Sequence, residues 1–280
     1  MHNLLVVQEK AHLVVGADGK HSLVAKTVRS PEYNVQPVLT CAYYTYWSGL
    51  ELNGGELYSF PGAAVGIWPT NDGLAVIYTG YPITEFESIR GNTEGRFWQT
   101  LDMHAGLTER LRLGRQADRF YGTADLPGFY RKPYGPGWVQ VGDAGMTMDP
   151  ITGQGIGNAF SDAERLSEAV DSYFSGRVSF ERAMSTYEQA RNADTLPMYE
   201  FTSKIASFVP PPIEQQLMLS ALAHKREAAG QFFGMLSGSV PVQEFFSPGN
   251  VFHIIGASGM SRILFNKLKP SHRSAKMVPA

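Results

Sequence analysis

Apolar and polar residues alternate through much of the chain between Thr40 and Gly80. An alternation with period two, rich in aromatic and β-branched residues, predicts strands of a sheet whose two faces are both covered. Asn71-Asp72-Gly73 predicts a hairpin turn, because Asp-Gly supplies the positive φ that a tight connection needs. We expect strands at Cys41–Trp47, Glu56–Phe60, Ala64–Pro69 and Leu74–Gly80.

The rest of the chain mixes short apolar runs with helical spacing. Further strands are expected at Leu4–Val7, His12–Val15, Arg119–Gly122 and Trp138–Val141, with Tyr130–Gly137 as a loop. Helices are expected from an N-cap at Ser22 to Val28, over Thr84–Leu113 with interruptions at Gly91 and Gly106, over Gln154–Tyr173, over Phe180–Ile205, and over Ile213–Lys225. Pro197 should break or kink the fourth of these helices.

Composition narrows the class of protein. The 280 residues are 43% hydrophobic and 18% charged, which is enough apolar material for a real core. Twenty-four basic and 26 acidic side chains leave no basic stripe for nucleic acid. A single cysteine, Cys41, excludes an internal disulfide and fits a reducing cytoplasm. No secretory signal or transmembrane run is visible, and we expect the basic C-terminus (Arg262, Lys267, Lys269, His272, Arg273, Lys276) to be a solvated tail.

The strongest chemical signal is a strand that ends in Gly142-Asp143 and is followed by a glycine-rich loop. The loop runs from Asp149-Pro150 through Gly153-Gln154-Gly155-Ile156-Gly157-Asn158 into the long predicted helix. Glycines let backbone N–H groups approach a ligand, and a helix N-terminus favours an anionic group. Asp143 at the strand end would accept hydrogen bonds from ligand hydroxyls. The alternative is an ordinary strand-to-helix connection with a chance run of glycines.

A second signal lies near the start of the chain. The apolar run Leu13–Val15 ends in Gly16-Ala17-Asp18-Gly19, with Ser22 shortly after it. Asp-Gly after a strand is by itself most often a simple turn, and its interest comes from its occurrence together with the later motif.

Together these residues resemble the flavoprotein monooxygenase superfamily whose type member is para-hydroxybenzoate hydroxylase. Its DG motif is matched by Gly16, Ala17, Asp18, Gly19 and Ser22, and its GD motif by Gly142, Asp143, Pro150, Gly153, Gln154 and Gly155. The resemblance implies that Asp143 binds the ribityl chain of FAD and that the loop from Pro150 to Asn158, with Ile156 and Gly157, lies along the isoalloxazine. It also implies that Asp18 holds a loop near the pyrophosphate and the nicotinamide donor.

The chain departs from this family in two respects. No Gly-x-Gly-x-x-Gly turn precedes Gly16, although the family uses such a turn to hold the ADP half of FAD. Met146 stands where many members have histidine. We expect a truncated reading frame, ahead of a split protein or a degenerate homologue. The remaining strands should then expose an unpaired edge, and the chain alone should bind FAD poorly.

For the other candidate residues, structural roles are expected more than functional ones. Cys41 is expected to be a buried packing residue, and the scattered histidines predict no metal site. Arg131 and Lys132 could line the cleft or pair an anionic substrate, but a solvated loop is the preferred role. The aromatic residues Tyr43, Tyr44, Tyr46, Trp47, Trp68 and Tyr78 are candidates for pocket walls or core. No catalytic side chain is assigned, because flavin chemistry asks little of side chains.

The expected fold is α/β with mixed α+β character: an incomplete FAD-binding Rossmann-like domain, interwoven with a β-sheet substrate domain and followed by C-terminal helices. The expected segments are residues 1–30 (DG motif), 31–118 (substrate domain), 119–175 (GD motif) and 176–280 (helical region and tail). The expected function is an FAD monooxygenase that uses NADPH or NADH and molecular oxygen on a small aromatic or apolar substrate. The alternatives are a geranylgeranyl-reductase-like enzyme, a flavin halogenase as a weaker option, and a non-catalytic homo-oligomeric or complementing partner chain.

Overall fold

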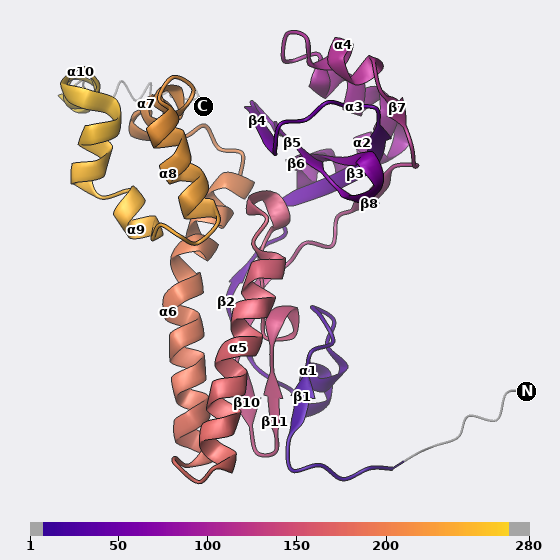
Figure 1. Ribbon diagram of the computed structural model, residues 1–280, viewed down its shortest axis with the longest axis vertical. Helices are drawn as coiled ribbons and strands as arrows, with labels where there is room; N and C mark the ends of the chain where they lie inside the picture. The colour runs from indigo at the N-terminus through magenta and orange to yellow at the C-terminus, as the bar shows by residue number, and fades with distance from the viewer. Residues whose placement is uncertain (1–7, 269–280) are drawn as a thin grey trace, which may run out of the picture. The chain divides into compact units, whose positions relative to one another are not determined.

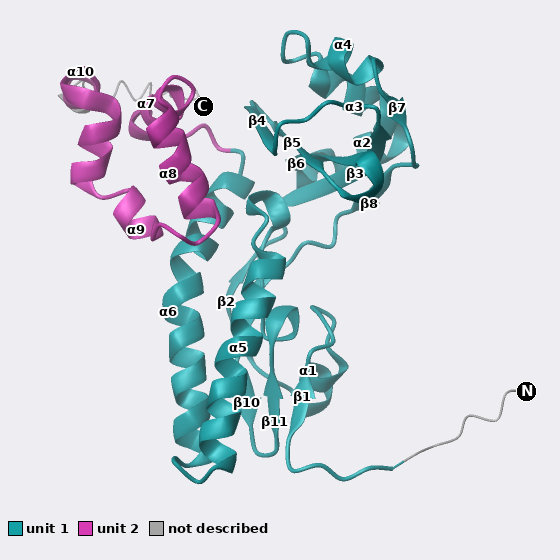
Figure 2. Ribbon diagram, viewed as in Figure 1, with its two compact units in different colours: residues 1–208 teal, residues 209–280 magenta. Residues whose placement is uncertain are grey.

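The computed structural model describes residues 8–268 (Figure 1), so the strand expected at Leu4–Val7 lies outside the described residues. The chain forms two compact units, residues 1–208 and residues 209–280 (Figure 2). The first unit contains all of the strands described and the first six α-helices, and the second is helical.

A six-stranded antiparallel sheet dominates the middle of the first unit. Its strand order is β4-β5-β6-β3-β7, and β8 also pairs with β3. The strands are β3 (Thr40–Ser48), β4 (Glu56–Phe60), β5 (Ala63–Pro69), β6 (Leu74–Pro82), β7 (Arg115–Gln116) and β8 (Tyr121–Thr123). The strands expected between Thr40 and Gly80 are therefore confirmed. The hairpin turn is confirmed too, since Asp72 and Gly73 both have positive φ, at 57° and 69°.

Three short helices lie between β6 and β7 in the chain, where the sequence predicts interrupted helical structure. They are α2 (Phe86–Gly91), α3 (Thr93–Leu101) and α4 (Leu107–Arg112). Their apolar faces pack on the sheet, with Trp47, Ile77, Phe97 and Leu111 in one buried cluster. The Trp47 indole N–H donates to the Leu111 carbonyl at 3.0 Å, which satisfies the polar atom of this large ring inside the core.

Two three-stranded sheets bring the ends of the first unit together. One has the order β1-β11-β10 and the other β12-β9-β2. The strands are β1 (Val14–Gly16), β2 (Glu32–Gln36), β9 (Gly128–Arg131), β10 (Tyr134–Gly135), β11 (Trp138–Gln140) and β12 (Met146–Thr147). The loop expected at Tyr130–Gly137 is wrong at Tyr130–Arg131, which belong to β9, and at Tyr134–Gly135, which form β10. Tyr130 pairs with Met146 on one side and with Tyr33 on the other. Strand pairing with distant segments overrides the local turn signals there.

Three helices complete the first unit. Helix α1 (Leu23–Val28) is capped by Ser22 as expected, and α5 (Gly155–Phe174) packs against α6 (Phe180–Ala206) (Figure 1). Of the break or kink expected at Pro197, the break is wrong, since α6 runs through this residue. Buried neighbours of Pro197, Thr195, Met198 and Tyr199, hold this part of the helix against the strands, which compensates for one lost backbone hydrogen bond.

The second unit is a small helical cluster. Its helices are α7 (Ile213–Leu222), α8 (Arg226–Leu236), α9 (Val242–Phe245) and α10 (Pro248–Leu268), and its buried residues include Met218, Met235, Phe245 and Ile254. Sequence reasoning located only the first of these helices. Of the basic residues expected in a solvated tail, Arg262 and Lys267 lie in α10, so the tail is wrong there, although Arg262 is exposed. Lys269 and the basic residues after it lie outside the described residues. None of the described helices combines the length and apolar character of a membrane span.

Candidate functional site

The two sequence motifs leave the same edge of one sheet. Strands β1 and β11 run parallel, and Gly16 lies opposite Gln140 as its Cα partner. The Val141 N–H donates to the Gly16 carbonyl at 3.0 Å, which ties the strand ends together. Ligands of open α/β sheets bind outside the carboxyl ends of parallel strands. The structure therefore brings the turn with Asp18 beside the turn with Asp143.

The Gly142–Ala144 turn is a 3-10 turn that needs glycine at its first position. Gly142 has a φ of 59°, and a Cβ there would lie 3.2 Å from the Cβ of Ala159 on α5. The Gly145 N–H donates to the Gly142 carbonyl at 2.8 Å and closes the turn. Glycine at 142 thus allows both the turn and the close approach of the helix.

Asp143 projects from this turn and its side chain is exposed. The surrounding protein displaces part of its water, and this desolvation raises the pKa of the Asp143 carboxyl, while the Lys20 ammonium opposes the shift. An exposed carboxylate such as that of Asp143 can accept hydrogen bonds from a hydroxylated ligand.

The second loop of the GD motif leads into the N-terminus of α5. Asp149 accepts hydrogen bonds from the Ile151 N–H at 3.0 Å and from the Thr40 hydroxyl at 2.5 Å. Gly153 has a φ of 70°, and hypothetical Cβ atoms on Gly153, Gly155 and Gly157 would meet open space. The first N–H groups of a helix have no partner within it and carry its positive dipole end. Backbone donors and open space therefore lie together at this loop.

Asp18 has a structural task in the described chain. Its carboxylate accepts hydrogen bonds from the N–H groups of Leu23 at 2.6 Å and Val24 at 3.3 Å, at the start of α1. A hydrogen bond from the Ser22 side chain is the largest cause that lowers the pKa of Asp18. Asp18 thus fixes the shape of the loop that contains Gly19 and Lys20, and a contact with a ligand would be additional to this role.

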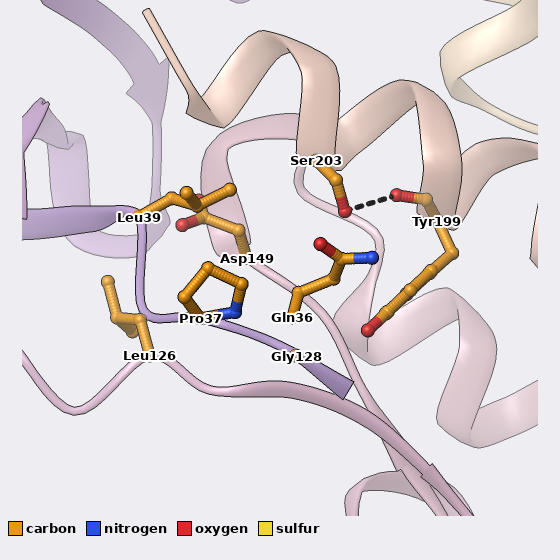
Figure 3. A pocket seen from close by; sticks show the side chains of 8 residues that line it. All are labelled: Gln36, Pro37, Leu39, Leu126, Gly128, Asp149, Tyr199 and Ser203. Atoms are coloured by element: carbon orange, nitrogen blue, oxygen red, sulfur yellow. Dashed lines mark hydrogen bonds between the residues drawn. The ribbon is translucent and has the colours of Figure 1, made fainter. Parts of the chain in front are cut away.

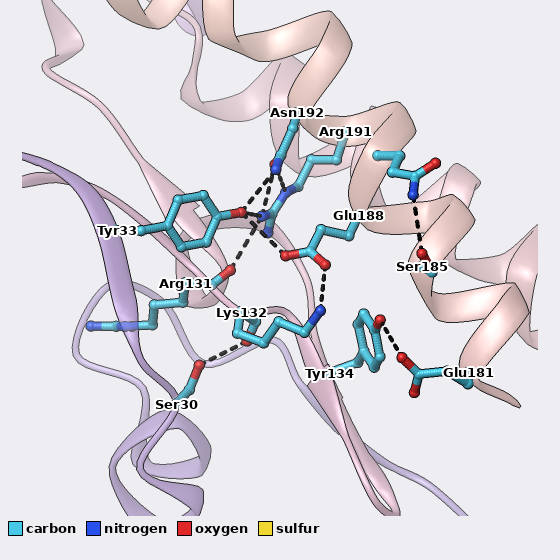
Figure 4. A network of polar contacts seen from close by, with 11 residues as sticks. Ser30, Tyr33, Arg131, Lys132, Tyr134, Glu181, Ser185, Glu188, Arg191 and Asn192 are labelled. Atoms are coloured by element: carbon cyan, nitrogen blue, oxygen red, sulfur yellow. Dashed lines mark hydrogen bonds and ion pairs between the residues drawn. The ribbon is translucent and has the colours of Figure 1, made fainter.

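Arg131 connects the two motif loops. Its guanidinium donates to the Lys20 carbonyl at 3.0 Å and to the Ala144 carbonyl at 3.1 Å, and it pairs with Glu32 at 2.9 Å. The side chain is only 8% exposed, so the expectation of a solvated loop is wrong for Arg131. Lys132 pairs with Glu188 of α6 at 2.6 Å, as Figure 4 shows, and does not line an open cleft. Arg131 is held in the fold because β9 is an inner strand of its sheet, whereas Lys132 follows β9 and is held by its ion pair with Glu188.

Sequence reasoning missed two buried charges near the GD turn, Asp162 on α5 and Arg191 on α6. Both are 0% exposed. The one available signal is position: Asp162 lies three residues after Ala159 and four before Leu166, so it falls on the buried stripe of its helix. An acidic residue on an apolar stripe indicates a polar task inside the fold.

The structure divides the aromatic candidates between core and surface. Tyr43 and Trp47 are buried in apolar clusters, while Tyr44 and Trp68 are each 38% exposed. Cys41 is fully buried as expected, and burial raises the pKa of its thiol to about 11. Within residues 8–268 no three histidine, cysteine, aspartate or glutamate side chains gather as a metal site would require.

A small pocket lies behind the GD loop, between β2, β9 and α6 (Figure 3). It is lined by Gln36, Pro37, Leu39, Leu126, Gly128, Asp149, Tyr199 and Ser203. Asp149 is its buried acidic group, and burial raises the pKa of that carboxyl. With room for about one water molecule, the pocket is a hydration site at most and does not hold a substrate.

Comparison with known proteins finds relatives in sequence and in fold. No protein-family model matches the chain. It is 30% identical over 193 residues to a digeranylgeranylglycerophospholipid reductase of Methanosarcina acetivorans, a match that covers 64% of this chain and 44% of that protein. It is 28% identical over 215 residues to a kynurenine 3-monooxygenase of Anopheles gambiae, covering 70% and 43%. The chain thus spans less than half the length of these relatives.

Solved structures share the fold. PqsL of Pseudomonas aeruginosa, a probable FAD-dependent monooxygenase, aligns with a TM-score of 0.57 at 21% identity and covers 79% of this chain and 59% of its own. A flavoprotein/dehydrogenase of Cytophaga hutchinsonii aligns with a TM-score of 0.68 at 14% identity, covering 91% and 62%. The mixed α/β fold and the resemblance to the FAD-dependent oxidoreductase superfamily are confirmed.

Proposed function

We propose that this chain, which resembles FAD-dependent oxidoreductases in sequence and fold, carries the flavin-side half of an FAD site. The observation that supports this most is the pairing of Gly16 with Gln140, which brings the Asp18 loop and the Asp143 turn to one sheet edge. The residues present fit the group in part. An exposed carboxylate, open glycine positions and a helix N-terminus suit a hydroxylated chain and a flat ring.

Each residue of this site then has a definite task. Asp143 would accept hydrogen bonds from the ribityl hydroxyls, and the backbone N–H groups between Pro150 and Asn158 that are not bonded within the loop would hold the oxygens of the ring. Gly153, Gly155 and Gly157, where a Cβ would meet open space, would let the ring approach the backbone, and Gln154 and Ile156 belong to the same loop. FAD, when bound, supplies the redox chemistry, and the protein supplies position, polarity and exclusion of water.

For the reaction, we place an NAD(P)H-dependent monooxygenase first, with molecular oxygen and a small aromatic or apolar molecule as co-substrates. The similarity to a kynurenine 3-monooxygenase supports this choice, and the exposed rings of Tyr44 and Trp68 on the large sheet are suitable for an aromatic contact. A geranylgeranyl-reductase-like reaction is the alternative, supported by the similarity to digeranylgeranylglycerophospholipid reductases. Oxygen consumption that follows NAD(P)H oxidation separates the two. The lone, buried Cys41 favours a cytoplasmic location.

The first test is flavin retention by the purified 280-residue chain. FAD is added, free cofactor is removed by gel filtration, and the visible absorption of the protein fraction is recorded. Because the residues present fit FAD only in part, we expect a weak but measurable flavin band for the native chain. The band should be at least several-fold weaker for Asp143→Ala and unchanged for the exposed control Glu168→Ala on α5. A well-folded native protein that retains no flavin would remove the support for an independent FAD site.

The second candidate is a non-catalytic role, which is favoured by the open edge and exposed faces of strand β1. Among the described strands it pairs with β11 alone, and Val14 and Val15 on its two faces are 49% and 48% exposed. Parallel strands are normally covered on both faces, and an open edge is a template for another strand. In this reading the chain completes a second polypeptide or a second copy of itself. Light scattering after gel filtration tests it: Val15→Lys should abolish association if the β1 edge mediates it.

A further inference from the structure

The Gly142–Ala144 turn that presents Asp143 lies between two fully buried charges. Asp162 of α5 lies near its first residue, and Arg191 of α6 binds the carbonyl just beyond its end. Both side chains are 0% exposed, and burying a charge costs free energy unless the charge is paired or hydrogen-bonded. The proposed FAD site gives neither charge a task.

Arg191 holds the carbonyl end of the turn. Its guanidinium donates to the Gly145 carbonyl at 3.3 Å and to the Arg131 carbonyl at 3.2 Å. It also donates to the Tyr33 hydroxyl at 2.9 Å, in the network drawn in Figure 4. A Cβ on Gly145 would lie 3.0 Å from Arg191 Nη1, so any larger residue would require the guanidinium to move by a few tenths of an ångström. The far end of the turn is therefore rigidly anchored to α6.

Asp162 faces the amide end of the turn. Ala159, one helical turn earlier on α5, contacts Gly142, and the Gly142 backbone N–H is close enough to lower the pKa of the Asp162 carboxyl. The nearest cation on its own helix is Arg165, with Nη1 at 3.9 Å. In the described part of the chain neither Asp162 oxygen has a partner at full hydrogen-bond geometry, and the buried Gln140 amide beside the turn is in the same state. This carboxylate therefore keeps acceptor capacity for the turn, although the Tyr187 hydroxyl also lies close enough to lower its pKa.

The two charges match the polarity of the turn. A helical turn presents N–H groups at its start and carbonyls at its end, so an anion belongs at Gly142 and a cation at Gly145. The other titratable groups that act on or near Asp162 are Arg165 of α5, Tyr187 and Arg191 of α6, Tyr130 of β9 and, on the turn itself, Asp143. The Tyr187 hydroxyl donates to the Gln140 carbonyl at 3.0 Å and also lies close enough to Asp162 to lower the pKa of that carboxyl.

We propose that Asp162 is the positioning residue of this turn: its carboxylate orders the Gly142 amide as Arg191 orders the Gly145 carbonyl, and together they fix the outward direction of Asp143. Asp162 acts through the backbone and touches no ligand itself. Only one consequence of this inference rests on the proposed function, namely that the affinity for FAD depends on Asp162. The ordering of the turn is a property of the chain alone.

Because Asp162 is buried, its interaction with the Gly142 amide should depend on pH. Desolvation raises the pKa of Asp162 to about 6, against the pull of Arg191 and the Gly142 amide. An ionised acceptor makes a hydrogen bond roughly twice as strong as a neutral one. Flavin affinity should therefore fall by a few-fold as the pH drops from 7.5 to 5.5. Glu164, exposed on the same helix, should contribute nothing to this change.

The test compares Asp162→Asn, Asp162→Leu and the control Glu164→Gln in the full chain. Amide hydrogen exchange of the Gly142–Gly145 segment is the first readout, and the FAD dissociation constant between pH 5 and pH 8 is the second. We expect Asp162→Leu to lose exchange protection in this segment and about tenfold in affinity. Asp162→Asn keeps an acceptor oxygen, so it should keep most of the protection and affinity but lose the pH dependence.

The outcomes separate the two proposals. Native exchange protection of the turn in a folded Asp162→Leu protein would overturn the inference, whatever the flavin does. Lost protection in that variant, together with a native chain that binds no FAD, would uphold the positioning role and defeat the proposed function. If Asp162→Leu loses global fold, Asp162→Asn decides: an unchanged pH profile of FAD affinity or turn exchange contradicts the role of the charge.

Discussion

Gly16 and Gln140 lie opposite each other on two parallel strands, and the chain turns away from this pair to Asp18 on one side and Asp143 on the other. The distance along the sequence between the motifs is bridged by a backbone hydrogen bond from Val141 to Gly16. The carboxyl ends of these two strands mark where a ligand can lie. The buried polar side chains around them, Arg131, Asp162 and Arg191, hold the turns that would contact it.

Replacement of Arg131 should uncouple the two motif loops. Arg131→Met removes the hydrogen bonds to the Lys20 and Ala144 carbonyls and leaves both acceptors without this partner. We expect a loss of about 2–3 kcal/mol in the free energy of unfolding, with weaker flavin retention. Urea denaturation measures the first effect, and the exposed Arg90→Met on α2 is the control. Equal stabilities for the two variants would contradict the tethering role.

Glycine at 142 should be required for two reasons that a matched pair of variants can separate. Gly142→Ala places a β-carbon at a φ of 59° and 3.2 Å from Ala159, whereas Gly137→Ala meets a φ of 78° and open space. In both variants the left-handed backbone costs about 1–2 kcal/mol of stability, and only Gly142→Ala adds a close contact with Ala159. Thermal denaturation should therefore rank Gly142→Ala as the less stable protein, and the reverse order would refute the close packing of α5 on the turn.

The ionisation of Asp162 should make the protein less stable as the pH rises. The pKa of this carboxyl is about 6 in the folded chain against an ordinary 3.8, so the folded state binds more protons between these values. Stability from this group is therefore full below about pH 4, falls as the pH rises, and levels off above about pH 6, with a total change of at most about 3 kcal/mol.

Asp162→Asn should remove this slope and raise stability at pH 8 while abolishing the pH response of flavin binding. Urea unfolding at pH 5 and pH 8 checks the first effect, with Glu164→Gln as the control. A lower stability of Asp162→Asn at pH 8 would show that the carboxylate contributes more to the fold than its burial costs.

Cys41 should be unreactive in the native protein. Its thiol is fully buried, and burial raises its pKa to about 11, so almost no thiolate forms at pH 8. A thiol reagent at pH 8 should label the denatured chain within minutes and the native chain only at the rate of unfolding. Rapid labelling of the native protein would mean that the β3 region opens locally.

Much of the local structure was determined by the sequence alone. The hairpin at Asn71-Asp72-Gly73, the cap at Ser22 and the glycine turn at Gly142 follow from backbone conformations that few residue types adopt. The strands of the large sheet follow from period-two alternation. These features depend on residues a few positions apart, which is why a pattern along the chain predicts them, and the same holds for the two motifs that resemble flavoproteins.

Only the tertiary structure decided which distant residues meet. Arg131 was expected in a solvated loop, and pairing of β9 with strands from both ends of the first unit buries it between the two motif loops. Helix α6 passes through Pro197 because tertiary packing outweighs one missing hydrogen bond. Asp162 and Arg191 gained their roles in the same way, since the cost and the use of a buried charge are set by neighbours that folding alone brings together.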